Sequence, residues 1–131
     1  MASALDTVRQ GVELRLFANW TDTEIAWQGH EFDPGEDDWI RPTLRFGGGR
    51  LESYSSTGVN TVDGLLLIDC FTVSKSGLGV LYGYVDELRD LFDRVTVGAV
   101  EFLAASGPRE VSDSLWQGLQ FEVPFIVIET S

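Results

Sequence analysis

Two stretches decide the fold of this chain: Gly64-Leu-Leu-Leu-Ile-Asp-Cys-Phe71 and, further along, Glu87-Leu-Arg-Asp-Leu-Phe-Asp-Arg94. The first is a short apolar run bounded by polar and glycine-rich sequence, which predicts a central strand over residues 65–73. A Gly/Ser turn follows it. The second stretch closes a helical pattern in which apolar residues recur on one side and acidic residues on the other. Its apolar stripe contains Leu81, Tyr84, Val85, Leu88, Leu91, Phe92 and Val95. This strand–turn–helix unit is a scaffold, because nothing in it is equipped for catalysis.

Length and composition limit the class of protein. A chain of 131 residues with 44% hydrophobic content predicts one folded domain with a single core. The longest apolar runs, at 65–68 and 124–128, are far too short to cross a bilayer. The first residues have neither a basic region nor a long apolar segment, so we expect no signal peptide and no membrane partner. The single cysteine, Cys70, excludes an internal disulfide and indicates synthesis in a reducing cytoplasm.

The charge balance is the strongest compositional signal. Nine basic and 21 acidic residues give a formal net charge of −12. This field repels nucleic acid, and no cluster of Lys or Arg offsets it locally. We therefore expect no specific DNA or RNA binding, although an acidic surface could let DNA pass without adhering.

The remaining patterns predict an α+β fold: a single domain over residues 1–131, with a mostly antiparallel or mixed sheet of about four to five strands packed against two helices. Residues 5–18 form the first helix, with a stripe of Leu5, Val8, Val12 and Leu16 that Leu14 and Phe17 widen. Pro42 lies inside a predicted strand at 39–46 and indicates an edge or a bulge. The other expected elements are a short strand within 23–28, a polar loop at 29–38, a long polar loop at 50–63, a strand at 95–104, a turn at 106–108 and a closing strand at 115–128 that contains Pro124.

Glycine-rich and nucleophilic motifs do not predict an enzyme. Gly77, Gly79 and Gly83 open the second helix, but their spacing departs from the dinucleotide fingerprint and only one helix lies between strands. The segment 47–50 lacks the Lys-Ser/Thr ending of a phosphate loop. His30 is the only histidine and has no partner at zinc spacing, so we expect a surface position. We also expect Cys70 to be a buried hydrophobe and not a nucleophile.

An acidic loop follows the first predicted strand and carries Glu31, Asp33, Glu36, Asp37 and Asp38. Carboxylates at this density could bind a magnesium ion weakly, in a site that bridges two subunits. The alternative is a solvated loop of an acidic protein, because the order of residues does not match a calcium loop.

The order of elements resembles the tail-terminator (tail-completion) and related minor tail proteins of long-tailed bacteriophages and gene transfer agents. The resemblance covers nearly the whole chain. It depends on the strand carrying Trp27, the acidic loop, the stretch from Gly64 to Phe71 and the Leu88-Arg-Asp-Leu-Phe92 helix end. It continues through Ser106-Gly107-Pro108 to the closing run Trp116-x-x-x-x-Phe121-x-Val123-Pro124-Phe125.

This resemblance implies a structural virion protein without enzymatic activity or cofactor, made in the host cytoplasm and located in the tail or neck. Members form a homo-oligomer, a hexameric ring that caps the tail tube, ends tail growth and offers a surface to the head-tail connector or stopper protein. DNA would pass through the lumen without specific binding. A neck stopper or another minor tail protein is the nearest alternative, and a small cytoplasmic ligand-binding domain is the alternative from a different class.

Three groups of residues are candidates for the interfaces of such a ring. The first is the acidic loop, through Asp33, Asp37 and Asp38. The second is the polar loop at 50–63, whose tip carries Tyr54, Ser55 and Asn60 and would reach toward the tube or the lumen. The third is a set of aromatic residues, Trp39, Phe46 and Trp116, for which a place in the domain core is the alternative.

Overall fold

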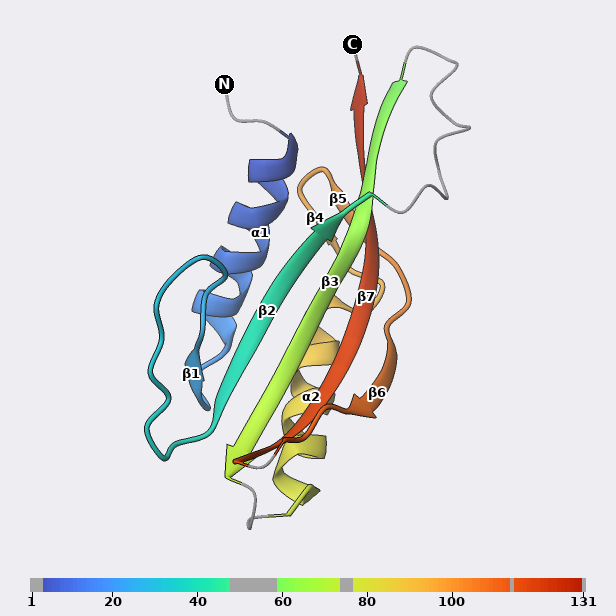
Figure 1. Ribbon diagram of the computed structural model, residues 1–131. Helices are drawn as coiled ribbons and strands as arrows, with labels where there is room; N and C mark the ends of the chain where they lie inside the picture. The colour runs from blue at the N-terminus through green and yellow to red at the C-terminus, as the bar shows by residue number, and fades with distance from the viewer. Residues whose placement is uncertain (1–3, 48–58, 74–76, 114, 131) are drawn as a thin grey trace.

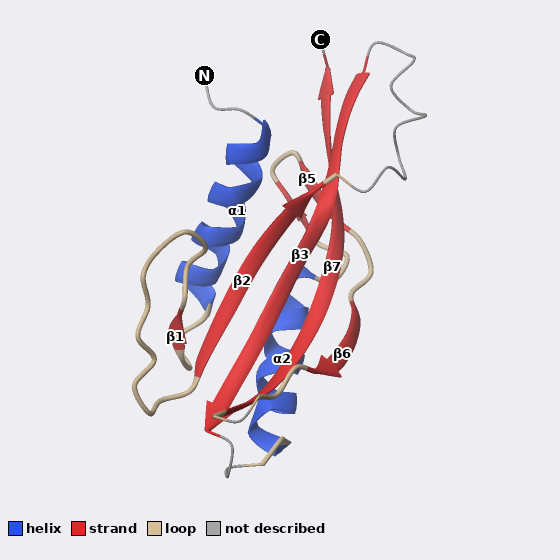
Figure 2. Cartoon of the chain, viewed as in Figure 1, coloured by secondary structure: helices blue, strands red, loops and turns tan. Residues whose placement is uncertain are grey.

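The fold is an α+β domain with two helices on one face of a curled, mixed sheet, as seen in a computed structural model that describes residues 4–47, 59–73, 77–113 and 115–130 (Figures 1 and 2). The elements follow in this order: α1 (Ala4–Asn19), β1 (Glu24–Ile25), β2 (Trp39–Phe46), β3 (Val59–Val73), α2 (Gly79–Phe92), β4 (Thr96–Val97), β5 (Val100–Phe102), β6 (Ser106–Glu110) and β7 (Trp116–Thr130). The predicted fold class is confirmed, but the sheet has seven strands and not four or five.

The sheet is built around one long antiparallel pair. β3 and β7 pair from Val59 opposite Thr130 to Val73 opposite Trp116. β2 lies on the other side of β3, and β1 adds a short parallel pairing at Glu24 and Ile25. On the far side of β7, β5 and β6 pair with different parts of the strand, and β4 pairs with β5. The strand order is β1-β2-β3-β7-β5-β4, with β6 beside β7.

Three sequence predictions need correction. The predicted strand at 95–104 is a short hairpin of β4 and β5, because the chain turns at Gly98, which has φ 58°. The predicted turn at 106–108 lies inside β6, where Gly107 and Pro108 fall between the pairings of Ser106 and Arg109 and interrupt the register. The polar loop predicted at 50–63 is shorter, because residues 59–63 belong to β3.

The backbone of Pro42 faces the edge of β2 that lies beyond the short pairing with β1, in agreement with the edge predicted from its sequence. The N–H of Ala26 donates to the carbonyl of Ile40, so the backbone groups of Ile40 point toward β1 and away from β3. Because backbone directions alternate along a strand, those of Pro42 and Leu44 point the same way. The missing N–H of Pro42 therefore removes no bond from the pairing with β3.

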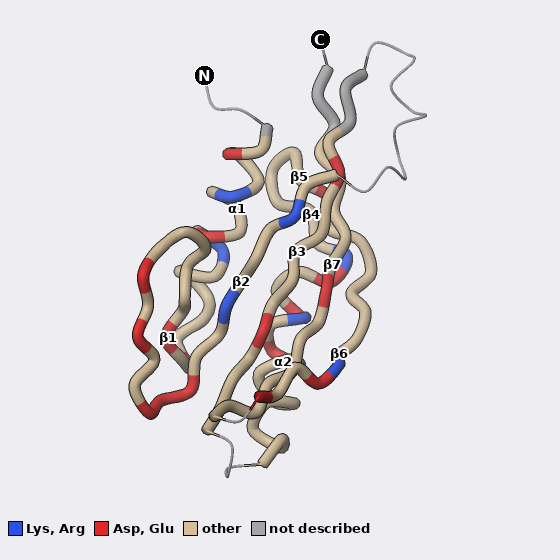
Figure 3. Tube along the Cα trace, viewed as in Figure 1, with Lys and Arg blue, Asp and Glu red and all other residues tan. Residues whose placement is uncertain are grey.

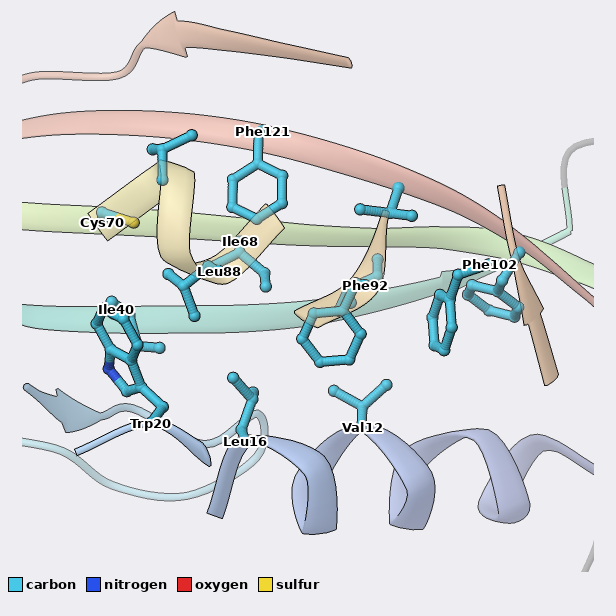
Figure 4. Close-up of a cluster of buried hydrophobic side chains, with 14 of the residues drawn as sticks. Val12, Leu16, Trp20, Ile40, Ile68, Cys70, Leu88, Phe92, Phe102 and Phe121 are labelled. Atoms are coloured by element: carbon cyan, nitrogen blue, oxygen red, sulfur yellow. The ribbon is translucent and has the colours of Figure 1, made fainter. Parts of the chain in front are cut away.

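A single core fills the space between the two helices and one face of the sheet (Figure 4). α1 supplies Val8, Val12 and Leu16, while α2 supplies Leu81, Val85, Leu88 and Phe92. The sheet supplies alternate residues of β2, β3, β5 and β7, among them Ile40, Leu66, Ile68, Cys70, Phe102, Phe121, Val123 and Phe125. Trp20 packs edge-on against Tyr84 at 5.6 Å between ring centroids and joins the end of α1 to α2.

Leu14 and Phe17 do not widen the buried stripe of α1. They are 68% and 79% exposed, whereas Val12 and Leu16 are buried. At about 100° of helical rotation per residue, Leu14 and Phe17 project from the side of α1 opposite Val12. The first helix is thus apolar on two faces, and only one of them packs on the sheet.

Candidate interaction surfaces

The sheet face away from the helices carries an aromatic cluster, formed by Phe32, Trp39, Phe71 and Trp116. Trp39 stacks on Phe71 with ring centroids 4.3 Å apart and meets Trp116 edge-on at 5.8 Å. Phe32, from the loop between β1 and β2, lies 5.3 Å from Trp39. Trp39 and Trp116, both predicted as interface or core aromatics, therefore lie together on this face. Neither belongs to the core beneath the helices.

Gly118 makes room for this cluster. It lies directly opposite Phe71 in the β3–β7 pairing. A Cβ atom at position 118 would lie 2.8 Å from the Phe71 ring, which is shorter than a van der Waals contact. Phe71 is only 5% exposed although it is on the outer face, because its neighbours cover it. The Arg41 guanidinium carbon is 5.1 Å from the Phe71 ring centroid and adds a cation–π contact.

Beside the aromatic cluster, a polar row crosses four strands through Arg41, Asp69, Gln120 and Arg109. Arg41 of β2 donates to Oδ2 of Asp69 at 3.0 Å, and Gln120 of β7 donates to Oδ1 at 2.7 Å. Arg109 of β6 donates to Oε1 of the Gln120 side chain at 2.9 and 2.6 Å. Asp69 is 3% exposed, so these bonds compensate a nearly buried carboxylate. The side chains of this row therefore connect the four strands by hydrogen bonds on the outer face of the sheet.

The acidic loop divides into an anchored part and an exposed part. Both carboxylate oxygens of Asp38 accept hydrogen bonds of 2.6 Å, from Thr72 of β3 and from Tyr84 of α2. Partial burial, then the bond to Asp38 and its negative charge, raise the pKa of Tyr84. Asp33 and Asp37 are exposed, and Asp33 accepts the N–H of Gly35 in the turn after Pro34. Asp38 therefore links the loop to β3 and α2 of its own chain. The sequence predicts a subunit contact at Asp38 and does not predict these intramolecular hydrogen bonds.

No cluster of metal-ligating side chains is present among the described residues. Within those residues, no three His, Cys, Asp or Glu side chains converge in a way that could hold a metal ion. His30 is exposed in its loop, as predicted. Cys70 is fully buried, and burial, followed by the negative charge of Asp69, raises the pKa of its thiol. The predicted role of Cys70 as a packed hydrophobe is thus confirmed.

The pKa of Glu87, in α2, is raised by its interactions with Asp22 in the turn after α1. A hydrogen bond with Asp22 has the largest effect, followed by desolvation and then by the negative charge of Asp22. The opposite shift occurs at the start of β7, where the backbone N–H groups of Trp116 and Leu115 donate to Asp113 and lower its pKa. The first pair is a site of repulsion at neutral pH, and the second is a turn that a charged carboxylate stabilises.

At one end of the sheet, β3 and β7 continue as a two-stranded β3–β7 arm, residues 59–61 and 128–130 (Figures 1 and 2). β2 ends opposite Gly64, and β5 pairs no further along β7 than Val127. Among the described strands, none pairs with the outer edges of this arm at residues 59–61 and 128–130. Asn60, one of the predicted interface residues, lies in this arm opposite Glu129. Tyr54 and Ser55 lie outside the described residues.

The charges are distributed unevenly over the chain (Figure 3). Acidic positions are spaced along the loop between β1 and β2. Arginines of β2 and β6 lie in the polar row on the outer face of the sheet. In the described part of the chain, neither helix is long and apolar enough to cross a membrane.

Comparison with known proteins supports the fold and does not assign a function. No protein-family model matches the chain, and no curated protein matches it. Among the solved structures that match it, one covers 99% of both chains, with a TM-score of 0.72 and 15% sequence identity, and its name carries no functional description. At this level of identity, the similarity shows a shared fold alone.

Proposed function

We propose that this protein is a structural component of a phage-like tail that forms a ring on the end of the tail tube, ends tail growth and presents a joining surface to the head. The resemblance in the order of elements supports this role. The observation that carries it is the β3–β7 arm, whose unpaired edges would be covered by neighbouring copies in a closed ring. The formal charge of −12 per copy fits a lumen through which DNA slides.

The backbone of the arm indicates how neighbouring copies would meet. The N–H of Gly47 donates to the carbonyl of Asp63, so the backbone groups of Asp63 point toward the β2 side. By alternation, those of Thr61 point the same way, where β2 has already ended. A strand of a second copy could therefore pair with β3 at Thr61 without disturbing its pairing with β7.

The test is the molar mass of the purified protein by light scattering, with and without magnesium, followed by negative-stain imaging of closed rings. We expect Thr61→Pro, which removes an edge N–H, to prevent ring formation. We expect Thr61→Val, which keeps the N–H, to preserve it. Circular dichroism of both variants separates failed assembly from failed folding.

A second experiment adds purified tail tubes, since the tube could act as the template for the ring. Rings on the tube ends that appear only with wild-type protein and Thr61→Val would support the proposal. A protein that stays monomeric and does not bind tubes would contradict it and favour the alternative, a small ligand-binding domain.

A further inference from the structure

A continuous groove, here called the α1–β2 groove, runs along α1 between this helix and the open edge of β2. Its largest hollow, about 520 Å³, is lined by Leu14 and Phe17 of α1 and by Trp27 and His30 from the segment after β1. A second hollow of about 410 Å³ lies at the other end, beside Leu5 and Phe46. A smaller hollow shares Trp27 with the first and Leu44 with the second, and so joins them.

Exposed apolar side chains are concentrated in this groove. Of the eight large hydrophobic residues that are exposed in the described part of the chain, four line it. They are Phe17 (79% exposed), Leu14 (68%), Leu5 (47%) and Phe46 (40%). From Leu5 to Phe17 the helix advances about 18 Å, the length of roughly three helical turns.

Leu14 and Phe17 project from the side of α1 opposite Val12, whereas Leu5, seven residues before Val12, lies on the same side as Val12. Between these two ends, the groove is lined by polar and charged side chains of α1: Asp6, Arg9, Gln10 and Glu13. The groove is therefore apolar at its ends and polar between them, and its most exposed apolar patch, Leu14 and Phe17 beside Trp27, indicates a docking site.

The edge of β2 that forms one wall of the groove is closed to strand addition. Pro42 has no N–H to offer. The side chain of Gln28 occupies the next outward-facing position, because its carbonyl accepts the N–H of Leu44 at 2.9 Å and its amide donates to the Leu44 carbonyl at 3.4 Å. A partner must therefore bind through side chains and not through backbone pairing, which favours a helix laid into the groove.

The charges beside the groove favour a basic occupant. Both arginines of α1 are already engaged: Arg9 pairs with Asp6 and Glu13, and Arg15 donates to the backbone carbonyl of Leu91 in α2. His30 lines the largest hollow, and the loop that continues from it carries acidic positions, among them Glu31 and Asp33. Figure 3 shows acidic positions along this loop. A second copy of this chain would bring more carboxylates against this loop, whereas a cationic segment would complement it.

We infer that the α1–β2 groove binds a basic amphipathic helix of a partner protein, with its apolar side chains on Phe17 and Leu14 at one end of the groove and its cationic side chains toward the acidic loop. This inference goes beyond the proposed ring and does not depend on it, because the β3–β7 arm is a separate surface. Neither helix in the described part of the chain is basic, so the inferred occupant is a helix of another protein.

The test uses two fluorescently labelled peptides of about 14 residues, long enough to cover the groove as a helix. One contains only Leu and Lys in an amphipathic pattern, and the other has Glu in place of every Lys. We expect the Lys peptide to bind the wild-type protein and the Glu peptide not to bind. Phe17→Ser should weaken binding of the Lys peptide by about tenfold or more, since it removes the largest exposed anchor.

Leu115→Ser is the matched control, because Leu115 is 71% exposed and lies outside the groove. Its affinity should stay within about twofold of wild type. Equal binding by the Phe17→Ser and wild-type proteins, or no binding of the Lys peptide, would overturn the inference. The molar mass of Phe17→Ser is measured in parallel: unchanged assembly is expected, and loss of rings would assign this face to a second copy and also overturn it.

Discussion

At the scale of single residues, the outer face of the sheet depends on a few positions that hold unusual environments. Asp69 is a nearly buried carboxylate whose two oxygens bind side chains from both neighbouring strands. Gly118 of β7 leaves space for the ring of Phe71 on the outer face of the sheet. Cys70, the neighbour of Phe71 in β3, packs in the core on the other face. Each position leads to its own prediction, because hydrogen bonding matters at the first, packing space at the second and burial at the third.

Replacing Asp69 by Ala should destabilise the protein by about 1–3 kcal/mol, because Gln120 and Arg41 lose the acceptor that joins them. The free energy of unfolding from urea titration measures this loss. Asp69→Asn keeps an acceptor for one neighbour and should lose less. Equal losses in the two variants would contradict the role of the polar row.

Replacing Gly118 by Ala should cost about 1–3 kcal/mol through overpacking, because the added methyl group would lie against the Phe71 ring. The same urea titration measures it, and Gly83→Ala is the control, since nothing lies within 4 Å of a Cβ at that exposed helical position. A neutral Gly118→Ala would show that the aromatic cluster can shift freely.

The thiol of Cys70 should react with Ellman's reagent only after unfolding. It is completely buried and its pKa is raised, so little thiolate is accessible in the native protein. The reaction is followed by absorbance with and without guanidinium. Rapid labelling of the native protein would place Cys70 at an open surface.

At the scale of elements, the helices are tied to the rest of the domain by polar contacts beyond the core. Asp38 binds β3 and α2 at once, and Arg15 of α1 donates to the carbonyl of Leu91 at the end of α2. Asp22 and Glu87 have the opposite effect at neutral pH, since the raised pKa of Glu87 shows that its charged form is disfavoured in the folded protein.

Stability should decrease as the pH rises through the pKa of Glu87. This pKa lies above the usual value of 4.5, so the folded state holds the proton more tightly than the unfolded state does. Glu87→Gln removes this loss, and its melting temperature should exceed that of wild type by more at pH 7 than at pH 4. Asp86→Asn, one residue away and exposed, controls for the general effect of removing a negative charge. The same pH dependence in both variants would contradict the pair.

At the scale of the whole molecule, one core joins both helices to the long β3–β7 pair, while two surfaces have no partner within the described part of the chain. These surfaces are the β3–β7 arm and the α1–β2 groove. They lie on different elements and offer different chemistry, backbone edges in one case and apolar side chains in the other. Assembly into a ring and binding of a partner helix can therefore be tested separately.

The domain should unfold in one cooperative transition. Circular dichroism reports the helices, and fluorescence reports the four tryptophans, of which Trp20 lies in the core and Trp39 and Trp116 lie on the outer face. Coincident denaturant midpoints for the two signals are expected, because both faces share β2, β3 and β7. Separate midpoints would show that the outer face is not coupled to the core.

The local pattern determined much of the fold: both helices, the edge position of Pro42, and the central and closing strands. Apolar periodicity and proline chemistry are local properties, so they can be read from consecutive residues. The same reasoning failed at 95–104 and 106–108, where an apolar run hides a hairpin and where turn residues sit inside a strand.

Only the tertiary structure decided which surfaces are available. Leu14 and Phe17 resemble core residues along the helix, but the sheet covers one side of α1 and leaves them outside. Asp38 resembles its acidic neighbours, yet Thr72 and Tyr84 bind it from distant parts of the chain. The polar row likewise needs a register among β2, β3, β7 and β6 that no local pattern specifies. Contacts between segments far apart in sequence depend on packing, and packing is a property of the whole folded chain.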